Sequence, residues 1–144
     1  MSYVRIWVHL VWATKRREPI LTADVRRYLC LQIMQNCKEK GIYLRAINGY
    51  LDHLHCLISL GNGQTIAEVA QFIKGGSSHW INQNRIVNGG FDWQDDYFAV
   101  SVSESIVPAV VRYIHNQERH HASKSFDDEV NEFISKFGFV RING

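Results

Sequence analysis

The stretch IYLRAINGYLDHLHCLISL, residues 42–60, consists of two β-rich runs that meet near the turn dipeptide Asn48-Gly49. An Asn-Gly pair between two such runs is typical of a tight hairpin turn. We therefore expect Ile42–Tyr50 and Leu51–Leu60 to pair as an antiparallel hairpin. This hairpin provides two neighbouring strands of a sheet that the rest of the chain has to complete.

The segments on both sides of the hairpin alternate between strand and helix patterns. Every second residue is apolar in Tyr3–Ala13, which predicts a strand. Helical spacing from Thr22 or Asp24 to Lys40 predicts a helix that Gly41 ends. The other expected elements are a helix from the Thr65–Glu68 capping box to about Lys74, a second helical piece over Ser77–Asn84 after the Gly75-Gly76 pair, a loop over Asn88–Asp96, a strand over Tyr97–Ser103, a helix that Ser105 caps and that continues to about His121, and a helix over Phe126–Phe137 that Gly138 stops.

The order β-α-β-β-α-β followed by helices is that of a split βαβ sandwich. We expect an α+β fold of the ferredoxin-like type, in which helices cover a four-stranded antiparallel sheet and a C-terminal helix carries Tyr113. The chain has 144 residues and shows neither repeats nor low-complexity linkers, which favours a single domain over residues 1–144. Since this fold carries many functions, the function has to be inferred from the sites.

Composition excludes several classes of protein. Hydrophobic residues make up 46% and charged residues 21% of the chain, as in ordinary soluble proteins, and no run reaches the roughly 20 apolar residues of a membrane helix. Three cysteines without C-x-x-C spacing argue against a disulfide framework and a zinc knot. We expect a cytoplasmic protein with no membrane partner.

Positive charge is concentrated in the first third of the chain. Residues 1–45 hold nine Lys and Arg against three Asp and Glu, and the remainder holds seven against eleven. Clustered cations can bind nucleic-acid phosphates by releasing counterions, although a solvated surface is the plainer interpretation. Lys15, Arg16 and Arg17 are the candidates for such contacts, together with Lys74 in its Lys-Gly-Gly-Ser segment.

His53 and His55 form a local pattern that suits metal binding. They lie two residues apart on one strand, so both imidazoles project from the same face and can chelate one divalent cation. A pair of half-buried, hydrogen-bonded histidines is the alternative, with about equal weight. A third ligand has to come from elsewhere in the chain.

The helix expected to end near His121 carries polar groups along one edge of its apolar stripe. On a helical wheel Tyr113, Gln117 and His120 fall within an arc of about 60°. The Gln117 amide oxygen can ligate a cation, and the Tyr113 hydroxyl can act as a nucleophile near a Lewis acid. A tyrosine at the rim of the core with its hydroxyl in water is the ordinary alternative. His120 and His121 are expected to end the helix in solvent.

A combination of four segments resembles one known family. The segments are His53-Leu54-His55, Lys74–Trp80, Phe91–Gln94 and Tyr113–Gln117. Together they resemble the single-tyrosine transposases of small bacterial insertion sequences, which belong to the HUH nuclease superfamily, named for histidine, hydrophobic residue, histidine. The resemblance extends from the first strand to about Gly138. It implies a homodimer that cuts and rejoins single-stranded DNA beside hairpins at the ends of a mobile element.

The resemblance also implies roles for the candidate residues. His53, His55 and Gln117 would hold Mg²⁺ or Mn²⁺, and Tyr113 would attack the scissile phosphate and remain joined to the DNA 5′-phosphate. From its place on the helical wheel, and not from the resemblance, His120 is a candidate to assist in binding the phosphate, with a solvated helix end as the favoured alternative. In this family the tyrosine helix can reach across the dimer, so the active site lies within one chain or is shared between two, with residues 122–125 as a flexible link.

Three other functions fit parts of the pattern. A domesticated relative would use the same chemistry as an endonuclease that processes chromosomal repeat hairpins. A non-catalytic module that binds RNA or single-stranded DNA would share the sandwich, but the RNP1 pattern is missing from every predicted strand. A two-histidine metal oxygenase needs a carboxylate as its third ligand, and the expected partner here is Gln117.

Overall fold

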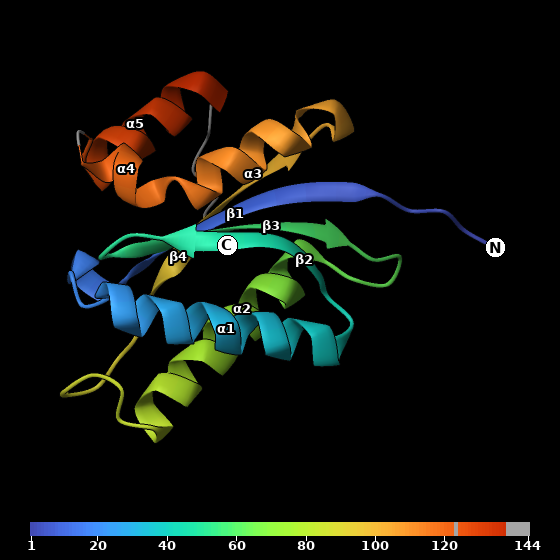
Figure 1. The fold of residues 1–144 in the computed structure, drawn as a ribbon. Helices are drawn as coiled ribbons and strands as arrows, with labels where there is room; N and C mark the ends of the chain where they lie inside the picture. Colours follow the sequence, from blue (N-terminus) through green and yellow to red (C-terminus); the bar gives the residue numbers. More distant parts are fainter. Residues whose placement is uncertain (123, 138–144) are drawn as a thin grey trace.

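A computed structural model describes residues 1–122 and 124–137 of the chain, and it confirms the predicted α+β sandwich (Figure 1). A four-stranded antiparallel sheet has the strand order β2-β3-β1-β4. In chain order, the elements are β1 (Ile6–Thr14), the 3₁₀ turn η1 (Lys15–Arg17), α1 (Ala23–Lys40), β2 (Tyr43–Gly49), β3 (His53–Leu60), α2 (Ile66–Gln83), β4 (Trp93–Val102), the 3₁₀ turn η2 (Glu104–Ile106), α3 (Val107–His115), α4 (Gln117–His121) and α5 (Phe126–Phe137).

Helices cover both faces of the sheet. Figure 1 shows α1 and α2 on one face and α3, α4 and α5 on the other. Neighbouring residues of the central strand β1 point to opposite faces of the sheet and pack against the helices there. Leu10 packs in the core beneath α1 and α2, whereas Val11 packs against α5. None of the described helices is long and apolar enough to cross a membrane.

The hairpin forms as predicted, but its turn lies elsewhere. Asn48 and Gly49 belong to β2, where they pair with His55 and Leu54, and the chain turns over the three residues that follow. A Cβ atom on Gly49 would lie 2.1 Å from the carbonyl oxygen of His53. Glycine is therefore needed here for the close approach of two backbones rather than for the conformation of a turn.

Helix α2 runs unbroken through Gly75 and Gly76, so the predicted interruption is wrong. Ile73, Ser77 and Ile81 share one buried face of the helix, and the Ser77 hydroxyl donates to the Ile73 carbonyl over 2.6 Å. Burial of this face outweighs the roughly 1 kcal/mol that each glycine costs within a helix. The predicted start is confirmed, because the Thr65 side chain accepts a hydrogen bond from the Glu68 amide.

The C-terminal third differs from the prediction in three places. Strand β4 begins at Trp93 rather than Tyr97, since a bulge lets Trp93 pair with Thr14. The long helix is divided at Asn116 into α3 and α4, and Ser105 does not cap it. Helix α5 has the predicted bounds, while the predicted stop at Gly138 lies outside the described residues.

Candidate metal and tyrosine site

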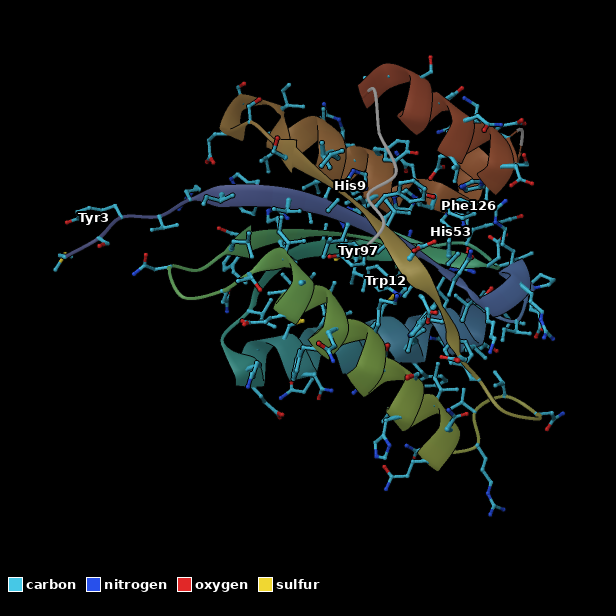
Figure 2. All side chains as sticks on the ribbon, turned by 180° about the vertical axis from the view of Figure 1, so that it is seen from behind. Tyr3, His9, Trp12, His53, Tyr97 and Phe126 are labelled. Carbon is cyan, nitrogen blue, oxygen red and sulfur yellow. The ribbon has the colours of Figure 1, made fainter. Side chains whose placement is uncertain are left out.

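Two histidines of β3 lie on the face of the sheet that α3, α4 and α5 cover. His53 and His55 alternate with core residues of the opposite face, and both side chains are completely buried. The Phe126 ring of α5 stacks on His53 with a centroid separation of 4.0 Å. Figure 2 labels His53, Phe126 and His9. His9 belongs to β1 and lies on the same face of the sheet as the two histidines of β3. The pleat of the sheet thus places both imidazoles under the C-terminal helices.

Tyr113 of α3 and Gln117 of α4 reach the same place from above the sheet. The Tyr113 ring centroid lies 5.5 Å from that of His55. The Gln117 side chain is fully buried, and its Oε1 atom lies 3.2 Å from His53 Nε2. The structure therefore brings the four predicted site residues together within one chain.

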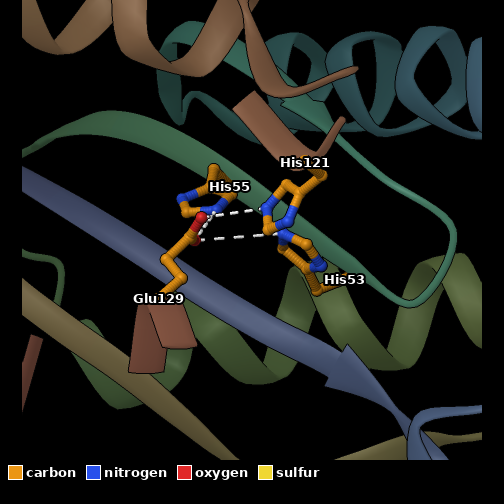
Figure 3. A group of neighbouring side chains, drawn as sticks. All are labelled: His53, His55, His121 and Glu129. Carbon is orange, nitrogen blue, oxygen red and sulfur yellow. Dashed lines mark ion pairs between the residues drawn. The ribbon is translucent and has the colours of Figure 1, made fainter. Parts of the chain in front are cut away.

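Two residues that sequence reasoning did not select complete the cluster (Figure 3). Glu129 of α5 is 1% exposed, and its carboxylate lies 2.6 Å from His55 Nε2 and 2.9 Å from His121 Nε2. His120 Nε2 also lies 2.9 Å from this carboxylate. The prediction that His120 and His121 end the helix in solvent is wrong, because α5 folds back over them. The sequence predicts Gln117 as the third partner of the histidine pair, and the structure adds the Glu129 carboxylate to it.

Each of the three central histidines has a neighbour at its other ring nitrogen. His53 Nδ1 lies 2.7 Å from an oxygen of Asp52, and His121 Nδ1 lies 2.7 Å from the Lys124 carbonyl oxygen. His55 Nδ1 lies 2.9 Å from His9 Nε2. Such outer contacts fix the orientation of an imidazole ring.

Sequence signals for these additional residues are unequal. The spacing of Gln117 and His121, i and i+4 on one helix, places both on the same side once the helix is known to restart after Asn116. Asp52 directly precedes His53, but the period of a strand places neighbouring residues on opposite faces, so the sequence gives no reason to pair them. Glu129 carries no comparable signal, because its position depends on how α5 packs.

Burial and charge shift the pKa values of the site in opposite directions. Burial lowers the pKa of His9 to about 3 and that of His55 to about 4. Burial works to raise the pKa of Glu129, but its contacts with His121 and His55 hold it well below its usual value. Burial, followed by the charge of Glu129, raises the pKa of Tyr113. In the absence of a cation, the site favours neutral His9 and His55, a protonated phenol and an ionised carboxylate.

The predicted DNA-binding residues do not form one surface. Lys15, Arg16 and Arg17 form η1 at the end of β1, and the Arg17 guanidinium lies over the Phe126 ring at 5.2 Å. Lys74 belongs to α2 on the opposite face, and its ammonium group donates to the carbonyl oxygens of residues 94 and 95 over 2.7 Å each. Of these cations, Arg17 contacts the helices that cover the histidine cluster, whereas Lys15 lies 3.8 Å from the Asp92 carboxylate.

A split βαβ sandwich with a His-Leu-His strand facing a helix-borne tyrosine defines the HUH class with a single tyrosine. Within this class the chain belongs to the IS200-like transposases, because the family model described as "Transposase IS200 like" matches residues 2–117. The resemblance stated from the sequence is thereby confirmed.

Individual relatives are consistent with this membership. The ISDra2 transposase TnpA of Deinococcus radiodurans is 25% identical over 114 residues, which cover 76% of this chain and 81% of the relative. A crystal structure from Deinococcus radiodurans R1, assigned as a transposase, matches with a TM-score of 0.65 and 27% identity over 81% of this chain and 95% of that one. A REP-associated tyrosine transposase bound to a REP hairpin shares the fold, with a TM-score of 0.59 and 19% identity over 84% and 72% of the two chains.

Proposed function

We propose that this transposase cuts and rejoins single-stranded DNA beside hairpins that mark the ends of its element, through a covalent 5′-phosphotyrosine intermediate. The observation that carries the proposal is the position of the Tyr113 ring, 5.5 Å between centroids from His55 of the same chain. A phenol beside paired imidazoles suits a nucleophile that attacks a phosphate polarised by a cation. The hairpin form of the DNA is supported by the ligand of the REP-associated relative.

Tyr113 is the proposed nucleophile. Its phenolic oxygen attacks phosphorus and loses its proton, the bond from phosphorus to the 3′ oxygen breaks, and that oxygen takes up a proton to become a free 3′-hydroxyl. The DNA 5′-phosphate stays on the tyrosine. Because this ester is about as energetic as the bond it replaces, the 3′-hydroxyl of another strand can attack it and rejoin DNA without ATP.

The donor set fits a divalent cation. The Asp52 carboxylate accepts from His53 Nδ1 over 2.7 Å, which leaves the Nε2 lone pair of a neutral His53 facing Gln117 Oε1. With His55, these atoms would hold the expected Mg²⁺ or Mn²⁺, and two imidazoles suit Mn²⁺ better than Mg²⁺. When bound, the cation supplies positive charge that polarises the scissile phosphate and favours the developing phenolate.

Access to the site is part of the proposal. His53, His55 and Gln117 are completely buried beneath α4 and α5. DNA therefore has to displace part of this cover before a phosphate can meet Tyr113. The three cations of η1 and His120 are proposed to bind the DNA backbone near the site, and Lys74 to bind it on the opposite face.

Homodimer formation is a further proposal from the family. Since Tyr113 and Gln117 lie beside the histidine pair of their own chain, each subunit of such a dimer would contain a complete site. A shared site would require the tyrosine helix to leave this position and enter the partner.

The test uses labelled single-stranded oligonucleotides from the flanks of the gene, incubated with protein and Mn²⁺. We expect an adduct of protein and DNA that resists SDS, and we expect Tyr113→Phe to abolish it. Tyr28→Phe is the matched control, because this tyrosine is 53% exposed on α1. An undiminished adduct in Tyr113→Phe would refute the assignment of the nucleophile, and cleavage without any adduct would favour water as the nucleophile.

A further inference from the structure

We propose that His121 and Glu129 are further ligands of the cation that His53 and His55 hold, so that residues from β3, α4 and α5 form one metal site. This inference rests on the proposed function, because it concerns the metal site described there. It extends the ligand set beyond the two histidines and Gln117 that the sequence selected.

The spacing of the four side chains is the first argument. One ligand atom from each of His53, His55, His121 and Glu129 lies within 4.8 Å of the others (Figure 3). Around an ion with bonds of about 2.1 Å, neighbouring ligand atoms lie roughly 3 Å apart. The Glu129 carboxylate lies 2.6 Å from His55 Nε2 and 2.9 Å from His121 Nε2. The four groups thus surround a space of the size that one cation fills.

The orientation of the imidazoles is the second argument. The outer nitrogens of His53 and His121 face groups that only accept hydrogen bonds, namely the Asp52 carboxylate and the Lys124 carbonyl. Both Nδ1 atoms must therefore donate, and in the neutral rings both Nε2 lone pairs point inward. Histidines that bind metals are typically held in this way by an outer carboxylate or carbonyl. The inward lone pairs face further oxygen atoms, and a cation between them satisfies both.

The burial of Glu129 is the third argument. Its side chain is 1% exposed, and its carboxylate faces the Nε2 atoms of His55 and His121 at 2.6 Å and 2.9 Å. A buried carboxylate is costly unless a cation or well-aligned donors compensate its charge. A divalent cation meets that need and is itself partly neutralised by the carboxylate. Three imidazoles and one carboxylate also favour Mn²⁺ and later transition metals over Mg²⁺.

The test measures Mn²⁺ binding by the metal-free, full-length protein in the absence of DNA, using titration calorimetry. Glu129→Gln keeps the size of the side chain and removes its charge, and we expect at least about tenfold weaker affinity, since even outer-shell changes cost about 10- to 100-fold. His121→Gln should weaken binding similarly. Glu129→Asp, which keeps the charge on a shorter arm, should give an intermediate value. Asp128→Asn is the matched control on the same helix, because its side chain is exposed, and it should bind within about twofold of the wild type.

The shift in Tm caused by Mn²⁺ is a second measure of metal binding, and it does not require an accurate concentration of active protein. Saturating Mn²⁺ should raise the Tm of the wild type and of Asp128→Asn, and should raise that of Glu129→Gln much less. Circular dichroism shows which variants are folded. If Glu129→Gln does not fold, Glu129→Asp is compared with the wild type in its place.

The outcomes separate this inference from the proposed function. Wild-type affinity in both Glu129→Gln and His121→Gln, with binding lost in His53→Gln, would overturn the inference and leave the metal site of the proposed function intact. Tighter Mn²⁺ binding in Glu129→Gln would overturn it as well, because Glu129 would then compete with the cation. If the wild type does not bind Mn²⁺, the cation is rejected both in this inference and in the proposed function. The role of Tyr113 as the nucleophile is then tested separately by the covalent adduct with DNA.

Discussion

The histidine on β1 makes a prediction about acid stability that needs neither metal nor DNA. His9 is 5% exposed, and burial lowers its pKa to about 3, with a further lowering by His55. In the unfolded chain the pKa returns to the ordinary value near 6.5. Below about pH 6.5, His9 is protonated in the unfolded chain but stays neutral in the folded protein. Acid therefore favours unfolding.

The size of the effect follows from these two pKa values. The contribution of neutral His9 to the free energy of unfolding is fully present above about pH 6.5. It falls by about 1.4 kcal/mol for each pH unit below that value, and it stops falling near pH 3, where the folded ring is protonated too. At pH 5 the loss due to His9 alone is therefore about 2 kcal/mol in the free energy of unfolding.

The measurement compares wild type with His9→Gln by urea unfolding at pH 7.5 and pH 5, both in a chelator that removes divalent cations. Glutamine does not titrate, and its amide group can still form a hydrogen bond with His55 Nδ1, as His9 does. We expect the wild type to lose about 2 kcal/mol more than His9→Gln between these pH values. Contributions of His55 and His121 affect both proteins and largely cancel in the comparison. Equal losses would show that the fold does not hold His9 neutral, and the reasoning from burial would be refuted.

Two further predictions concern the glycines and the cysteines. Gly49→Ala places a methyl group 2.1 Å from the His53 carbonyl oxygen, so urea unfolding should show a loss of at least about 2 kcal/mol. The paired variant Gly75→Ala meets no atom within 4 Å in the interior of α2 and should gain about 0.5–1 kcal/mol; a gain in both would contradict the close approach in the hairpin. Burial raises the pKa of Cys30 to about 12 and of Cys37 to about 11, and that of Cys56 well above the usual range. DTNB at pH 8 should therefore modify the native protein slowly and label all three thiols in urea, whereas fast labelling of the native protein would show that these thiols are accessible.

Local patterns in the sequence are sufficient for most of the fold. The Thr65 cap and the αL glycine at position 41 define helix ends through contacts within a few residues, so they can be read without tertiary information. The prediction failed where long-range packing decides the outcome. Burial beneath the sheet continues α2 through Gly75 and Gly76, and the backbone of His53 explains why Gly49 lies in a strand.

The histidine pair, the tyrosine and the glutamine were available to sequence analysis because period two and period 3.6 fix which side chains share a face. Such periodicity acts within one strand or one helix. It predicted that His53 and His55 project together and that Tyr113 and Gln117 share an edge, and the family resemblance joined the two pairs. Glu129 and His121 enter the site only because the chain bends after Asn116 and α5 packs back over β3. That packing depends on contacts between residues more than 60 positions apart, which no local pattern records, so only the tertiary structure places a carboxylate among the histidines.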